Sequence, residues 1–152
     1  MKAFFDYLRL VVISPELLAV LVVGAIYLFV PEPFAFGTLL LSSDMKWSIG
    51  TATFPLVLLG FCYQVGSDLL APVGKRAALL DWPDYPMLKR RVIFTLINCV
   101  VGFCLVFLGL FFVAKDKAVW GTMLVVAGLV SSAISLAGVA LAKWRSREIL
   151  GE

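Results

Sequence analysis

The sequence contains no histidine, and this absence removes several kinds of chemistry. Imidazole-ligated zinc and haem sites, Ser-His and Cys-His catalysis, and histidine proton relays all need the missing side chain. There is also no phosphate-binding loop and no GxSxG or HExxH motif. The three cysteines lie in apolar runs without CxxC spacing, which does not indicate a disulfide framework. We therefore predict a protein that is not an enzyme and that uses no cofactor and no metal.

Charged residues are scarce as well. Only 15% of the 152 residues are charged and 62% are hydrophobic, whereas about a quarter of the residues in a soluble domain are charged. A soluble core cannot bury so much apolar surface, so most of this chain should be solvated by lipid. The net charge of +3 is too small to indicate nucleic-acid binding.

Four apolar runs of membrane length follow one another along the chain. They predict an all-α integral membrane protein with four transmembrane helices arranged as two hairpins. Residues 1–152 are expected to form a single transmembrane domain. The predicted spans cover residues 10–30, 47–70, 87–114 and 119–142.

The segments around the first span carry more local signals. Ser14-Pro15-Glu16 is typical of a helix start, with serine as the N-cap, proline in the first turn and an acidic side chain next to it. Residues 1–13 are amphipathic and predict an N-terminal interfacial helix. Residues 32–47 contain two prolines, a glycine and a Ser-Ser-Asp cluster, and they predict a loop on the membrane surface.

The basic residues indicate how the spans are oriented. Two of the thirteen lie at the N-terminus, five in the connecting segment 71–91 and three at the C-terminus, which makes ten on one side. Only Lys46, Lys115 and Lys117 fall on the other side. Because Lys and Arg accumulate in cytoplasmic loops, both termini and segment 71–91 are predicted to be cytoplasmic. We expect the chain in the inner (plasma) membrane of a bacterium.

Polar residues within the apolar runs are the first candidate site. A carboxylate or amide facing lipid is costly, so these side chains should face protein or water. They predict a cytoplasm-facing cavity for a proton or cation, or else ordinary hydrogen bonds between helices. For the carboxylate of the first span there is a further alternative, a first-turn position at the interface where it meets the positive end of the helix dipole. The candidates are Glu16, Gln64, Asp68 and Asn98.

Small residues form a stripe along the fourth span. Such residues allow helices to approach closely in lipid, where apolar contact alone gives no drive for association. The stripe predicts helix packing, either within the chain or between copies of a homo-oligomer. It consists of Ala127, Gly128, Ser131, Ser132, Ser135, Gly138 and Ala142.

The connecting segment combines basic and aromatic side chains. A surface of this kind binds anionic lipid headgroups or docks a cytosolic protein through its aromatic and arginine side chains. The residues concerned are Lys75, Arg76, Trp82, Tyr85, Lys89, Arg90 and Arg91.

Two functions fit these features. The leading prediction is a small membrane subunit that self-associates and docks a cytosolic partner through segment 71–91, as a membrane sensor, effector or immunity-type protein would. The alternative is a small ion channel or a proton- or cation-coupled transporter that uses the polar candidates. Four helices leave no space for a central pore, so conduction would require several copies.

Overall fold

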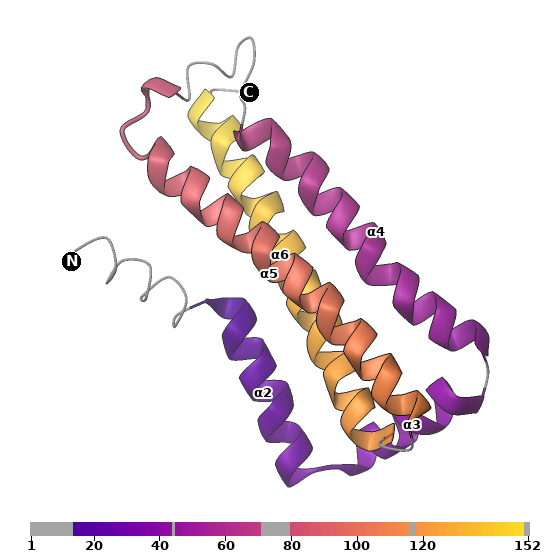
Figure 1. Cartoon of the computed structure of the whole chain (residues 1–152). Helices are drawn as coiled ribbons and strands as arrows, with labels where there is room; N and C mark the ends of the chain where they lie inside the picture. The colour runs from indigo at the N-terminus through magenta and orange to yellow at the C-terminus, as the bar shows by residue number, and fades with distance from the viewer. Residues whose placement is uncertain (1–13, 44, 71–79, 116–117, 151–152) are drawn as a thin grey trace.

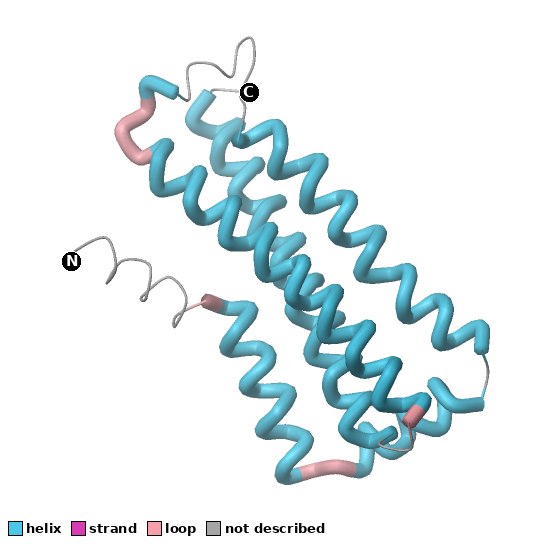
Figure 2. Tube along the Cα trace, in the orientation of Figure 1, coloured by secondary structure: helices cyan, strands magenta, loops and turns pink. Residues whose placement is uncertain are grey.

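The protein is helical throughout the residues that the structure describes. The computed structural model describes residues 14–43, 45–70, 80–115 and 118–150. These ranges contain the α-helices α2 (Pro15–Phe29), α3 (Glu32–Ser43), α4 (Met45–Leu70), α5 (Tyr85–Ala114) and α6 (Ala118–Leu150), which are drawn in Figures 1 and 2. The prediction of an all-α chain is therefore confirmed.

Three helical segments are long and apolar enough to cross a membrane: Ser48–Leu70, Tyr85–Ala114 and Ala118–Glu148. They correspond to the second, third and fourth predicted spans. Within the described residues, a fourth candidate span arises only if α2 and α3, which are bent by 101° at their junction, count as one broken span. The 15 residues of α2 extend about 22 Å, less than the roughly 30 Å of a hydrocarbon core. Residues 10–13 of the predicted first span lie outside the described residues, as does the predicted interfacial helix 1–13.

The prediction of a loop over residues 32–47 is wrong, because α3 occupies most of it. Pro33 is the second residue of α3, where a missing N–H costs no helical hydrogen bond. The carbonyl oxygen of Pro31 accepts hydrogen bonds from the N–H groups of Phe34 and Ala35, both at 3.1 Å. The Phe34 side chain is buried, and its ring meets that of Tyr27 edge-on with centroids 5.5 Å apart. Packing thus stabilises a helix that the local composition does not favour.

Helices α5 and α6 form an antiparallel hairpin whose backbones touch. A Cβ atom placed on Gly102 would lie 2.9 Å from the carbonyl oxygen of Gly128. One placed on Gly109 would lie 2.6 Å from the carbonyl oxygen of Gly121. Real Cβ atoms essentially never approach closer than 3.0 Å, so only glycine fits at these positions. Each helix carries its two glycines seven residues apart, about two helical turns, so the close approach continues along the seam.

The remaining helices pack onto this hairpin from different sides. Helix α4 lies against both α5 and α6, whereas α2 runs along α6 in the opposite direction (Figure 1). Val23 of α2 and Phe34 of α3 form a buried cluster with Ala127 of α6. The ring of Tyr27 also packs against that of Trp120 in a tilted arrangement, with ring centroids 5.0 Å apart. As a result, the N-terminal end of α2 lies beside the middle of the hairpin rather than beside one of its ends (Figure 1).

Candidate functional site

Glu16 stands in the first turn of α2, as the sequence predicts. The hydroxyl of Ser14 accepts a hydrogen bond from the N–H of Leu17 (3.1 Å) and donates one to Oε2 of Glu16 (2.9 Å). The prediction that Ser14 caps this helix is therefore confirmed. Both side chains are buried, with 4% of Ser14 and 5% of Glu16 exposed.

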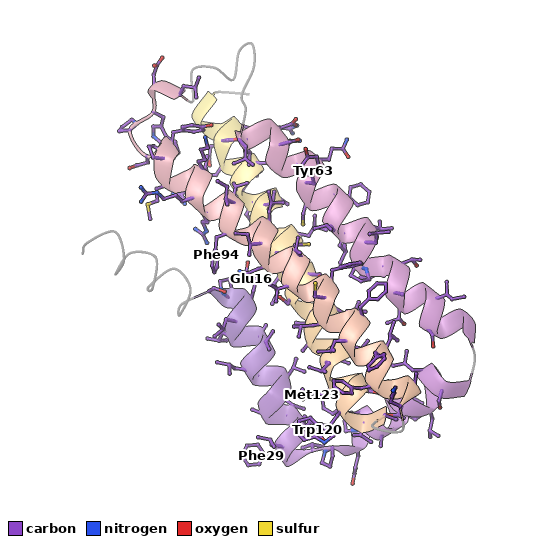
Figure 3. All side chains as sticks on the ribbon, in the orientation of Figure 1. Glu16, Phe29, Tyr63, Phe94, Trp120 and Met123 are labelled. Carbon is purple, nitrogen blue, oxygen red and sulfur yellow. The ribbon has the colours of Figure 1, made fainter. Side chains whose placement is uncertain are left out.

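The burial of Glu16 bears on both predictions for this residue, an ion-binding carboxylate and a first-turn carboxylate at the interface. A helix N-terminus stabilises a nearby carboxylate by about 0.3–1 kcal/mol, and by up to about 2 kcal/mol when partly buried. An acidic side chain at the centre of a membrane helix costs about 2.5–3.5 kcal/mol. At the centre of a bilayer, the first-turn position would therefore offset only part of this cost. Figure 3 shows Glu16 at the end of α2, against the middle of the hairpin.

Two polar atoms of the α5/α6 hairpin are buried without a hydrogen-bond partner. They are Nδ2 of Asn98 and Oγ of Ser135. Ser135 is fully buried, and Asn98 is half-buried overall. Buried polar atoms are nearly always paired, so these two exceptions among the described residues need a physical explanation.

The other two polar candidates lie elsewhere in the molecule. Gln64 is exposed on α4, on a face that it shares with Thr53 and Gly60. A Cβ atom placed on Gly60 would meet nothing within 4 Å, so no other part of the described chain covers this face. Asp68, at the C-terminal end of α4, forms a salt bridge with Lys143 of α6, with Nζ and Oδ2 3.1 Å apart. The four candidates therefore do not line one cavity.

The small-residue stripe of α6 contacts helices of its own chain. Gly128 and Ser132 face Gly102 of α5, and Ala127 faces α2 and α3. Ser131 and Ser135 are also buried, whereas Gly138 and Ala142 are half-buried. Of the four glycines of the seam, the stripe predicted from the sequence includes only Gly128, although the seven-residue spacings Gly102–Gly109 and Gly121–Gly128 carry the signal.

The connecting segment is described only from residue 80 onward, so Lys75 and Arg76 lie outside the described residues. Tyr85 is buried, and its hydroxyl donates to the carbonyl oxygens of Leu69 (3.2 Å) and Leu70 (3.1 Å). These bonds fix the start of α5 to the end of α4. Trp82 is half-buried next to this junction.

The basic side chains of the same segment remain exposed. Residues 89–91 lie in the first turns of α5 with their side chains exposed, and so do Arg145 and Arg147 in the last turns of α6. Because the hairpin is antiparallel, the start of α5 and the end of α6 meet at one end of the bundle (Figure 1). We call this surface, made of residues 89–91, Arg145 and Arg147, the basic end.

In comparisons with known proteins, the chain matches no protein family, no curated protein sequence and no solved structure.

Proposed function

We propose that this chain is a non-enzymatic multi-pass subunit of a bacterial inner membrane that self-associates and docks an acidic cytosolic protein at its basic end. The observation that carries the proposal is the gathering of five exposed cations from two helices at one end of the bundle. Positive side chains are typical of the cytoplasmic ends of membrane helices. Their field attracts an acidic protein surface and orients its approach.

Apolar side chains among these charges support a protein partner. Met87 is 67% exposed and Trp144 is 66% exposed, and both lie within a turn of the basic residues. Interfaces use large apolar and aromatic anchors surrounded by charge. The hydrogen bonds of Tyr85 hold the start of α5 in place, so less order has to be gained on binding.

Self-association is supported by the exposed polar face of α4. The α6 stripe is occupied by contacts within the chain, whereas Thr53, Gly60 and Gln64 have no cover. A glutamine side chain facing lipid carries a cost, which a hydrogen bond to a second copy removes. The α4 face is therefore the surface at which we place contact between copies.

The experiment replaces four cations of the basic end with glutamine: Lys89, Arg91, Arg145 and Arg147. The wild type is expected to copurify in mild detergent with a cytosolic protein in stoichiometric amount, and the variant is expected to lose it. The mass of the same wild-type complex, measured by light scattering, gives the number of copies. Protease protection of a terminal tag checks that the orientation is unchanged, since removing basic residues can invert it.

The matched control is Lys115→Gln, which removes an exposed charge at the opposite end of α5. The control should keep the partner. A glutamine variant that retains the partner contradicts the docking proposal. So does a wild type that binds only anionic lipid vesicles, since the basic end would then be a headgroup anchor. A wild type that is monomeric contradicts self-association.

A further inference from the structure

Glu16, at the start of α2, lies beside the middle of α6 and away from both ends of α6 (Figure 1). Val23 packs in one cluster with Ala127, and α2 runs antiparallel to α6 (Figure 1). Glu16 is two turns before Val23 on the same face of α2. Two turns beyond Ala127, in the opposite direction, lies the stretch between Ser131 and Ser135. By this count of turns, the carboxylate is level with the stretch of α6 that carries these two buried hydroxyls.

Asn98 of α5 lies at the same level. Thr95 contacts the position of Gly138 across the hairpin, with 3.7 Å between its methyl group and a Cβ placed there. Asn98 is three residues further along α5, and Ser135 is three residues back along α6. Because the two helices are antiparallel, both steps lead to one level. The buried, unpartnered atoms of Asn98 and Ser135 thus lie at the height of Glu16.

No basic side chain is present at this level among the described helices. Residues 92–114 of α5 and 118–142 of α6 contain no Lys, Arg, Asp or Glu. The titratable side chains in these parts of α5 and α6 are Cys99 and Cys104. On α2, Tyr27 is the one titratable side chain besides Glu16. Cys99 is fully buried. The negative charge of Glu16 therefore has no cationic partner in the described chain, and one positive charge is needed to balance it.

We propose that Glu16, Asn98 and Ser135 form a binding site for one monovalent cation, a proton or an alkali ion such as sodium. The carboxylate supplies the charge. The hydroxyl of Ser135 and the carbonyl oxygen of Asn98 are hard oxygen ligands, and the N–H donor of Asn98 is available to the carboxylate. Ser14, hydrogen-bonded to Oε2, orients the carboxylate. The site does not depend on the docking function of the basic end.

The test measures thermal stability of the full chain in lipid nanodiscs, because a bound cation raises the midpoint of unfolding by mass action. One series replaces choline chloride with sodium chloride at constant ionic strength and pH 8. A second series lowers the pH from 8 to 5 in choline chloride. The wild type is expected to gain stability, with saturation, in at least one series. A response to sodium identifies an alkali ion, and a response to acid alone identifies the proton.

The variants assign the response to the site. Glu16→Gln, which has no charge to balance, should lose it, whereas Glu32→Gln, at an exposed carboxylate of α3, should keep it. Ser135→Ala should raise the half-saturating cation concentration about tenfold through loss of one ligand. A wild type that responds to neither series overturns the proposal, and so does a response that survives Glu16→Gln. If Glu16→Gln does not fold, the wild-type titrations and Ser135→Ala decide, and an unchanged half-saturation in Ser135→Ala overturns the site.

Discussion

The α5/α6 hairpin and the bent α2/α3 pair both pack on α6, but they contact it in different ways. The hairpin contact is backbone against backbone, at Gly102, Gly109, Gly121 and Gly128. The contact of α2 and α3 is made by large side chains in the cluster around Val23 and Phe34. In lipid, close backbone approach and van der Waals packing hold helices together, because apolar burial gives little drive. The hairpin is therefore the tightly fitted part of the molecule, and the bent pair is the adaptable part.

The two contacts use neighbouring residues of one helix. Gly128 faces α5 whereas Ala127 faces α2 and α3, because successive residues of a helix point about 100° apart. The run of small residues on α6 therefore contacts both α5 and the α2/α3 pair, and the two contacts require different side-chain sizes. The α5 side tolerates no Cβ atom, and the α2 side accepts a methyl group under larger side chains.

The largest expected effect comes from filling the hairpin seam. Gly128→Leu should destabilise the protein by about 3 kcal/mol, because its side chain would clash with the backbone of α5 and force the helices apart. The measurement is unfolding in mixed micelles with increasing denaturing detergent, followed by circular dichroism. Gly50→Leu is the control, since Gly50 is exposed and a Cβ atom there meets nothing within 4 Å. Equal stability of the two variants would contradict a backbone-to-backbone seam.

A smaller effect is expected from the bent pair. Phe34→Ala removes a buried ring that packs on Tyr27, and should cost less than the roughly 3–5 kcal/mol of such a change in a rigid core, because neighbouring side chains move into part of the space. Phe36→Ala changes the same residue type on the same helix, but its ring is 64% exposed, so its cost should be near zero. If Phe34→Ala is as costly as Gly128→Leu, the bent pair is not the more adaptable contact.

Sequence reasoning identified the helices that are defined by their own composition. Length and apolar character locate α4, α5 and α6, and the Ser14-Pro15 signature locates the start of α2, because these signals are local. It failed at α3, where burial of Phe34 outweighs the loop-forming composition of the segment.

The candidate site was only partly accessible to the same reasoning. Glu16 and Asn98 stand out in the sequence because polar side chains are rare in apolar runs. Their common level with Ser135 depends on the antiparallel register of α2 and α5 against α6, which is a tertiary property. For Gln64 and Asp68 the error is the opposite one, because the sequence groups two residues that the structure separates. Periodicity puts them on one face of α4, yet one is exposed and the other pairs with Lys143.

The smallest expected effect concerns one hydrogen bond between the bent pair and α6. Thr38 and Thr122 share a hydrogen bond between their hydroxyls at 2.9 Å, and the Thr38 hydroxyl also donates to the carbonyl oxygen of Phe34. Thr38→Val keeps the shape of the side chain and should cost about 0.6 kcal/mol, the average for hydrogen bonds between membrane helices. Thr95→Val is the matched control, because the Thr95 hydroxyl donates within its own helix, to the carbonyl oxygen of Arg91. The difference between the two variants isolates the interhelical bond, and a difference of zero would show that side-chain packing alone holds α3 on α6.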